Sequence, residues 1–190
     1  MDPYVYPGTD VLKNLRDLRD DDQLSDFEAI ATNRRIAELL ERDKPGKFDL
    51  AHLQSTHRYI FQDVYDWAGA FRTVNIARPG QFYFAFAGMI VPALGELLDK
   101  LLRESYLANF DAERFSTRAA YYMGELNAIH PFRDGNGRTQ REFIRQLARA
   151  ASHTLNWSRV TRPQIYEASH RSFQRADHAG LAEVILAAIA

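Results

Sequence analysis

The chain has 190 residues with 24 basic and 25 acidic side chains, and its formal net charge is −1. This length fits one domain spanning residues 1–190, and a hydrophobic content of 46% is enough for a sizeable core. The charge balance argues against nonspecific nucleic-acid binding, and the absence of Cys excludes disulfides and cysteine-based zinc sites. No apolar run approaches the roughly 18 residues of a spanning helix and the N-terminus lacks a signal-peptide pattern, so we expect a cytoplasmic protein without a membrane partner.

Apolar residues recur at helical spacing along most of the chain, which predicts an all-α fold. Thr9 and Asp10 predict a first helix start, and an apolar stripe over residues 24–40 predicts a helix that ends near "DKPGK". Asp49 is expected to cap a helix over residues 50–67. Further helices are predicted over residues 89–102, 115–129, 138–151, from Thr161 and Pro163 onward, and over 181–188.

One segment, residues 72–86, departs from the helical pattern. Its sequence "RTVNIARPGQFYFAF" alternates at Val74 and Ile76, breaks at Pro79–Gly80 and resumes with an aromatic run. Alternation before a Pro-Gly pair and an aromatic run after it predict a small β-hairpin.

The stretch "HPFRDGNGRTQR" at residues 130–141 joins two predicted helices and is dense in chemically active side chains. The run Gly135-Asn136-Gly137 allows successive backbone N–H groups to converge on an anion. The next helix is expected to begin at about Arg138, and its unpaired N–H groups and dipole also favour negative charge. The joint therefore predicts an anion site.

The charged residues of this stretch suit a polyphosphate with a metal ion and a proton acceptor. Arg138 and Arg141 are three residues apart, so they share a helix face beside the predicted anion site. Asp134 is placed to hold Mg²⁺ that bridges phosphate oxygens. His130 is placed to take a proton from an incoming hydroxyl, and Phe132 is expected to anchor the loop in the core.

Each of these residues also fits a purely structural role. The glycines are common in helix caps and turns, Asp134 and Asn136 in turns, and arginines on solvated surfaces. Their convergence on one short joint favours a functional site.

The stretch resembles the Fic family motif HxFx(D/E)GNGRxxR at every fixed position. The segments "HRYIFQDVYDWAGAFR" and "RTVNIARPGQFYF" resemble the family's upstream helix with its YxWAGxxR turn and its flap hairpin. The segment "YVYPGTDVLKN" is similar to the N-terminal part of bacterial Fic toxins and secreted Fic effectors. The resemblance implies a helical bundle with the motif loop between two central helices and one small hairpin flap.

The resemblance also implies a protein adenylyltransferase, which moves AMP from ATP to a hydroxyl of a target protein. Carried over by position, His130 is the general base and Asp134 holds Mg²⁺. The implied nucleotide contacts are Gly135, Asn136 and Gly137 at the α- and β-phosphates, Arg138 at the β-phosphate, Arg141 at the γ-phosphate, and Thr139 and Gln140 beside the pocket. Val74, Asn75 and Ile76 would clamp the target by strand addition. Tyr166 lies either near the adenine or in the core.

Two alternatives to AMP transfer remain open. The Doc-type branch of the same superfamily phosphorylates its target, but its GNGR run is altered, whereas Gly135 and Gly137 are intact here. A non-catalytic nucleotide-binding or docking module would need neither His130 nor Asp134.

The resemblance further implies a way in which such a site is regulated. Many Fic proteins carry an inhibitory helix, (S/T)xxxE(G/N), whose Glu pairs with the second motif arginine. Here Glu28 follows Ser25 by three residues and precedes Ala29, and the C-terminal "HAGLAEVILAAIA" has no Ser or Thr at the required spacing. We therefore expect the toxin half of a toxin–antitoxin pair, whose small partner supplies a Glu against Arg141. The alternative is the N-terminal part of a translocated effector that acts in a host cytoplasm.

Overall fold

The computed structural model describes residues 2–41, 46–77 and 83–190, and these residues contain α-helices, short 3₁₀ turns and no β-strand. The all-α prediction is therefore confirmed. The helices are α1 (Asp21–Leu40), α2 (Leu50–Phe61), α3 (Ile90–Arg103), α4 (Ala112–Ile129), α5 (Asn136–Ala150), α6 (Arg162–Arg175) and α7 (Ala179–Ala188), with 3₁₀ turns at Ala87–Met89, Ser105–Leu107 and Trp157–Arg159.

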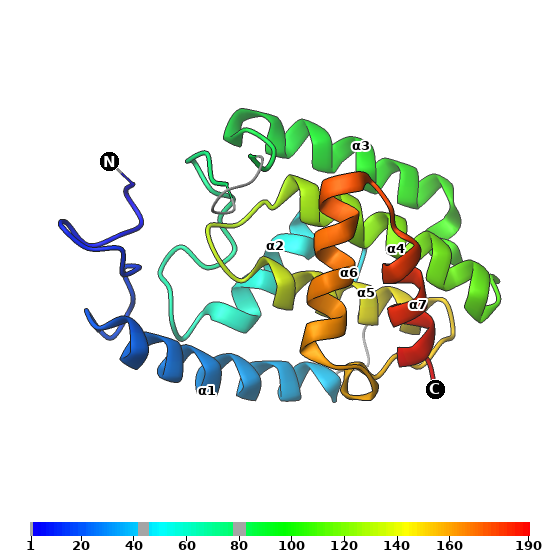
Figure 1. Cartoon of the computed structure of the whole chain (residues 1–190), viewed down its shortest axis with the longest axis horizontal. Coiled ribbons are helices and arrows are strands. Elements are labelled where there is room, and N and C mark those ends of the chain that lie inside the picture. The colour runs from blue at the N-terminus through cyan, green and yellow to red at the C-terminus, as the bar shows by residue number, and fades with distance from the viewer. Residues whose placement is uncertain (1, 42–45, 78–82) are drawn as a thin grey trace.

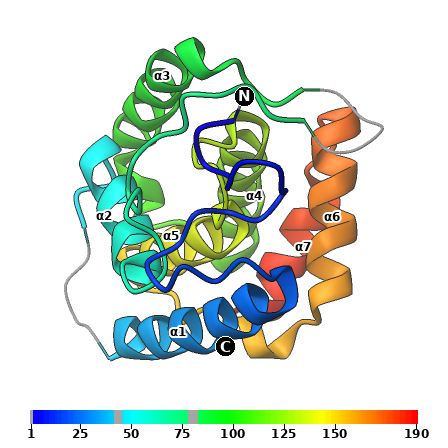
Figure 2. The same ribbon diagram turned by 90° about the vertical axis from the view of Figure 1, so that its left-hand side faces the viewer.

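Helix α4 lies at the centre of the bundle and packs against α3, α5, α6 and α7, while α2 packs against α1, α3 and α5. Figure 2 shows α4 and α5 surrounded by α1, α2, α3 and α6. One large hydrophobic cluster contains residues of the five helices from α3 through α7. A second, smaller cluster contains residues of the N-terminal segment, α1 and α2. The joint between α4 and α5 lies at the ends of these helices that face the N-terminal segment (Figure 1), and Arg133 of the joint donates to Asp2 at 2.9 Å.

Polar side chains cap several helix starts, as the sequence predicts for two of them. Asp49 accepts a hydrogen bond from the His52 N–H at 2.8 Å, and Thr161 forms a reciprocal capping box with Gln164. Helix α5 differs, because it begins after Gly135 with no capping side chain. Its first backbone N–H groups are therefore left for another acceptor.

The predicted helix start at Thr9 and Asp10 is wrong. Val5 and Leu12 instead form an isolated antiparallel bridge around a turn. The Thr9 hydroxyl donates to the Tyr6 carbonyl and accepts from the Val11 N–H. A hydroxyl that bonds to nearby backbone stabilises a turn as readily as a helix cap, so the sequence signal is the same for both.

Two helix boundaries also differ from the predictions. Helix α2 ends at Phe61, and Val64 is fully buried in the turn that follows rather than in the helix. Helix α5 begins at Asn136, two residues before the predicted start. The earlier start lengthens the open N-terminus at the predicted anion site.

Residues 72–86, predicted to form a hairpin, are called the flap below; among the residues of it that the structure describes, an antiparallel bridge joins Ala77 and Tyr83. The Phe84 N–H donates to the Ile76 carbonyl at 3.2 Å, which joins the two arms. The predicted turn at Pro79–Gly80 lies outside the described residues. Both arms also contact the end of α4 and the residues after it, because the Ala85 N–H donates to the Ala128 carbonyl and the Arg72 N–H to the Pro131 carbonyl.

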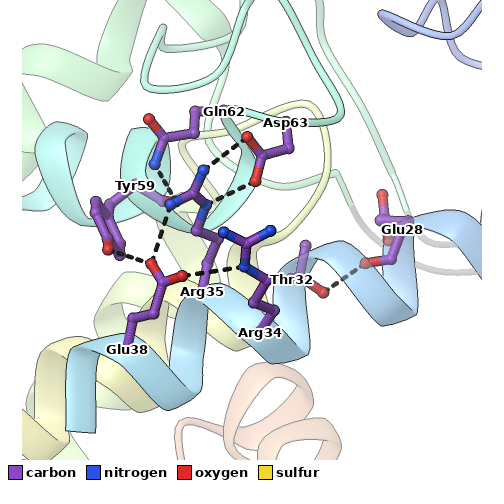
Figure 3. A network of polar contacts seen from close by, with 8 residues as sticks. All are labelled: Glu28, Thr32, Arg34, Arg35, Glu38, Tyr59, Gln62 and Asp63. Carbon is purple, nitrogen blue, oxygen red and sulfur yellow. Dashed lines mark hydrogen bonds and ion pairs between the residues drawn. The ribbon is translucent and has the colours of Figure 1, made fainter. Parts of the chain in front are cut away.

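Helix α1 docks on α2 through a polar network, which Figure 3 shows. Arg35 donates to both carboxylate oxygens of Asp63, at 2.6 and 2.8 Å, and to Glu38 at 3.0 Å. The Tyr59 hydroxyl donates to Glu38 at 2.5 Å. The network adds to the apolar contact that Leu24 and Leu39 of α1 make with the smaller hydrophobic cluster.

No helix among the described residues combines the length and apolar character that crossing a membrane requires.

Candidate active site

The loop between α4 and α5 is closed by two local devices. His130 ends α4 in the left-handed conformation (φ 50°, ψ 63°), and its N–H donates to the Leu126 carbonyl at 2.9 Å. Asn136, 3% exposed, accepts from the Phe132 N–H and donates to the Phe132 carbonyl, at 2.9 and 2.8 Å. The Asn136 side chain is therefore structural, and only its backbone N–H can meet a phosphate.

Gly135 is required by both conformation and space. Its φ is 78°, and a Cβ at this position would lie 2.2 Å from the Cζ atom of Phe61. The first helical hydrogen bond of α5 runs from the Thr139 N–H to the Gly135 carbonyl at 3.1 Å. The N–H groups of Asn136, Gly137 and Arg138 precede that bond, so the helix itself provides no partner for them.

His57 on α2 orients the start of this anion site. Its ring is buried between those of Phe61 and Phe132, with ring centroids 4.6 and 3.9 Å away. Nδ1 accepts from the Gly69 N–H at 2.8 Å, so Nε2 carries the proton and donates to the Asp134 carbonyl at 3.0 Å. Burial lowers the pKa of His57 to about 4, which keeps the ring neutral.

The contact between His57 and Asp134 has a direct consequence for the loop. The C=O of Asp134 and the N–H of Gly135 belong to one trans peptide, so they point in opposite directions. Because the carbonyl is turned toward α2, the Gly135 N–H faces away from α2, where it contacts the Asp134 carboxylate. The orientation of this peptide, which directly precedes α5, is thereby set by His57 and by the Asp134 carboxylate.

The predicted base, His130, has a defined tautomer in its neutral form. Its Nδ1 lies 3.2 Å from the Asn127 carbonyl oxygen, which can only accept, so Nδ1 carries the proton. The basic nitrogen is then Nε2. The ring also stacks on Phe84, with centroids 3.8 Å apart. Both contacts hold the imidazole in one orientation.

Arg72 joins the flap to the end of α4. Although it is 2% exposed, its guanidinium donates to the carbonyls of His130, Val74, Ala85 and Ile129. Burial lowers its pKa, and these carbonyls replace the water that its charge has lost. Both arms of the flap are therefore tied to the helix that carries the predicted base.

Asp134, the predicted magnesium residue, is partly buried at the end of the loop, directly before Gly135. One of its carboxylate oxygens contacts the Gly135 N–H, and the second has no hydrogen-bond partner among the described residues. Burial, and next the negative charge of Glu28, raise the pKa of this carboxyl. A carboxylate with one oxygen available fits Mg²⁺, which takes one or two protein carboxylates and fills its other positions with phosphate oxygens and water.

The two motif arginines have different surroundings. Arg138 donates to Glu28 on α1 at 2.5 Å and to the Thr32 hydroxyl at 3.2 Å. Arg141 has no acidic partner in the part of the chain that the structure describes. Its Nη1 would lie 3.4 Å from a Cβ on Gly137, so its guanidinium reaches over the first turn of α5. Burial, and next the charges of Arg138 and Arg162, lower its pKa to about 10, so it stays charged at neutral pH.

Three further predicted positions have different outcomes. Thr139 is 1% exposed and its hydroxyl donates to the Gly135 carbonyl, so the hydroxyl closes the first turn of α5, and a contact of this residue with the nucleotide stays a prediction. Gln140 is 5% exposed, and its Nε2 has no partner among the described residues, which suits an incoming acceptor. Tyr166 is 64% exposed, which excludes a core role, and its placement near the adenine stays a prediction.

The backbone groups of the flap residues predicted to bind the target point in two directions, toward the protein and away from it. The carbonyls of Val74 and Ile76 are used within the protein, by Arg72 and by the Phe84 N–H. Backbone groups of neighbouring residues in an extended chain point to opposite sides, so those of Asn75 face outward. Its side chain accepts from the Ala87 N–H at 2.8 Å, which joins this arm of the flap to the turn before α3. Asn75 is thus the position best placed for strand addition.

Sequence reasoning assigned no function to Glu28, His57 or Arg72, although all three touch the site. The resemblance covered His57 and Arg72 as parts of "HRYIFQDVYDWAGAFR" without giving either a role. The sequence holds one signal that could have identified His57, because it is a basic residue inside an apolar helical stripe.

Comparison with known proteins places this geometry in a family. Residues 47–148 match the Fic/DOC family model. The chain is 45% identical to protein adenylyltransferase VbhT of Bartonella schoenbuchensis, over 90% of the chain but only 36% of VbhT. It is 38% identical to the probable protein adenylyltransferase y4lH of Sinorhizobium fredii, over 90% of the chain and 88% of that protein.

A solved structure agrees over a similar length. The BepC protein of Bartonella tribocorum, described as a VirB-translocated effector with bound AMPPNP, superposes with a TM-score of 0.92 at 26% identity, covering 98% of this chain and 96% of that one. The motif, the fold and these relatives agree, and the chain is a member of the Fic/DOC family.

Proposed function

We infer that this chain is a protein adenylyltransferase, which transfers AMP from ATP to a hydroxyl group of a target protein. One observation carries the inference: the basic nitrogen of His130, the open N-terminus of α5 and two arginines converge on one helix–loop–helix joint. The names of VbhT and y4lH support the same activity.

The reaction follows from the roles proposed for these residues. The target hydroxyl attacks the α-phosphorus of ATP while Nε2 of His130 takes its proton. The bond from the α-phosphorus to the oxygen that bridges the α- and β-phosphates breaks, and pyrophosphate leaves. The N–H groups of Asn136 and Gly137, with Arg138 and Arg141, stabilise the negative charge on the leaving group. Thus the proposed site supplies a base and a charge-stabilising cradle without a covalent intermediate.

We propose Asp134 as the residue that holds Mg²⁺, because it offers a carboxylate oxygen beside the anion site. Bound there, the ion would neutralise phosphate charge and help align the reacting groups.

A small partner protein is proposed as the regulator. No carboxylate among the described residues contacts Arg141, so the proposed γ-phosphate position lacks an internal competitor in that part of the chain. A partner helix that places a Glu against Arg141 would compete with the γ-phosphate for the same guanidinium. The proposed place of action is a cytoplasm, either bacterial or that of a host.

Mass spectrometry tests the proposed function. Purified protein is incubated with ATP, Mg²⁺ and a bacterial lysate, and modified peptides are sequenced. An AMP adduct on a hydroxyl side chain is expected. Adducts confined to phosphate would contradict AMP transfer and favour the Doc-type reaction.

A further inference from the structure

We propose that Glu28 on α1 is a positioning residue for Arg138, which it holds together with Thr32 so that the guanidinium can meet the β-phosphate. The inference rests on the proposed nucleotide site and adds residues that lie far from the 130–141 stretch. Glu28 precedes Arg138 by 110 positions.

Helix α1 grips both terminal nitrogens of Arg138. Nη2 donates to Glu28 Oε1 at 2.5 Å, and Nη1 donates to Thr32 Oγ1 at 3.2 Å. Glu28 and Thr32 are four residues apart, so they share one face of the helix. The guanidinium also lies over the Phe61 ring, 4.6 Å from its centroid. Three contacts on different sides therefore fix its plane.

The contacts of Glu28 and Thr32 with Arg138 leave some of its N–H donors available to a ligand. A guanidinium has five N–H donors, and Nε of Arg138 has no partner among the described residues. The Nε side of the group can therefore bind phosphate oxygens while the terminal nitrogens stay on α1.

The two gripping residues are themselves held. The second oxygen of Glu28, Oε2, accepts from the Tyr65 hydroxyl, and the Tyr65 ring stacks on Trp67 at 4.2 Å. The Thr32 hydroxyl donates to the Glu28 backbone carbonyl at 2.7 Å (Figure 3). Because its proton is used in that bond, the hydroxyl oxygen can accept from Arg138. Each polar atom of the grip thus has a defined partner.

Helix α1 is in turn located by its contacts with α2. The bonds from Arg35 to Asp63 and from Tyr59 to Glu38 lie further along the same helix (Figure 3). The ion pair of Arg138 with Glu28 is partly buried, with side chains 24% and 12% exposed, so solvent screens it less than a surface pair. Arg138 is therefore preset by the fold, whereas Arg141 is left for the ligand or a partner.

The opposite role for Glu28 would be competition with phosphate for Arg138. The two roles predict opposite changes in affinity when the carboxylate is neutralised. A positioning carboxylate, once removed, weakens binding of a nucleotide that has a β-phosphate. A competing carboxylate, once removed, strengthens it. AMP, which has no β-phosphate, serves as the internal reference.

Calorimetric titration with ADP and with AMP, each with Mg²⁺, tests the proposal on the full chain. The variants are Glu28→Gln, which keeps the shape of the side chain, and Thr32→Val, which removes only the hydroxyl. Asp26→Asn is the matched control, because it removes the same charge from an exposed position two residues away on α1. Thermal unfolding checks that each variant is folded.

The expected result is a loss of ADP affinity of about ten-fold in Glu28→Gln, the usual effect of a lost hydrogen bond to a charged group. Thr32→Val should show a smaller loss in the same direction. AMP affinity should be unchanged in both variants, and Asp26→Asn should match the wild type. Tighter ADP binding, unchanged ADP binding, or equal losses for ADP and AMP in Glu28→Gln would each overturn the positioning role alone. A wild-type chain that binds neither nucleotide would overturn the proposed function as well.

Discussion

The ring of Phe84 on the flap stacks on the imidazole of His130, with centroids 3.8 Å and planes 16° apart. Arg72 reinforces this link, because its guanidinium bonds to the His130 carbonyl and to both arms of the flap. The segment proposed to hold the target and the residue proposed to activate its hydroxyl therefore form one unit. A target strand paired with Asn75 would lie on a surface whose distance from His130 is set by the fold.

Replacement of His130 tests its proposed role as the base. His130→Ala should leave folding and ADP binding intact and reduce AMP transfer by at least about a hundred-fold, the usual effect of a lost general base. The rate of target labelling, compared with ADP affinity measured on the same preparation, separates chemistry from binding. Wild-type turnover in His130→Ala would make this residue structural.

Replacement of His57 tests whether it sets the Asp134–Gly135 peptide. His57→Phe keeps a ring between Phe61 and Phe132 but leaves the Gly69 N–H and the Asp134 carbonyl without their partner. Each unsatisfied buried group costs about 1–3 kcal/mol, so the free energy of unfolding should fall, and ADP affinity should fall with it. Urea unfolding and calorimetric titration measure the two effects.

The control for this prediction is His153→Phe. His153 also lies beside an aromatic ring, that of Phe115, and its Nε2 bonds to a backbone carbonyl, that of Phe110. This variant should lose stability and keep its affinity for ADP. If His57→Phe behaves in the same way as the control, His57 supports the fold and not the anion site.

The sequence predicted the features of this molecule that are local. The all-helical class follows from apolar spacing within each segment, and the family follows from the 130–141 stretch. Both predictions are confirmed. The caps at Asp49 and Thr161 were also local and are found. Thr9 shows the limit, because its hydroxyl makes the same kind of bond in a turn as at a helix start.

Contacts between segments that lie far apart in the chain could not be predicted from the sequence. The spacing around Glu28 does not match the inhibitory motif, and no sequence pattern relates Glu28 to Arg138, yet the fold brings the two together. Arg72 could not be distinguished from a surface arginine, because its burial depends on carbonyls from the flap and from α4. The place of Thr139 in the motif predicts that it lines the pocket, but not that its hydroxyl closes the first turn of α5.

The α1–α2 network predicts a pH-dependent contribution to stability. The Tyr59 hydroxyl, followed by Arg35, lowers the pKa of Glu38 from 4.5 to about 2. A carboxyl whose pKa is lowered in the folded state stabilises that state above pH 4.5, and the stabilisation is lost as the pH falls toward 2. Glu38→Gln should therefore be less stable than the wild type at pH 7, and the difference should shrink below pH 4.5. Urea unfolding monitored by circular dichroism at pH 3 to 7 measures it, and a difference independent of pH would contradict the assignment.

Regulation through Arg141 predicts the behaviour of the isolated chain. Purified protein should modify itself or proteins in a lysate without any activating substitution, and its expression alone should slow cell growth. A partner carrying the inhibitory helix should suppress both effects, and replacing that helix's Glu by Gly should restore transfer while preserving the complex. An isolated chain that binds ATP but transfers nothing would point to an internal brake.

Parallel labelling with ATP carrying the label at the α-phosphate or at the γ-phosphate tests the central claim most directly. Wild-type chain and His130→Ala are incubated with lysate and Mg²⁺, and labelled protein is measured after separation by size. The account predicts that the α-phosphate label appears on protein with the wild type, that it is lost in His130→Ala, and that the γ-phosphate label is not transferred. Transfer of the γ-phosphate label in place of the α-phosphate label would identify a kinase and contradict the account.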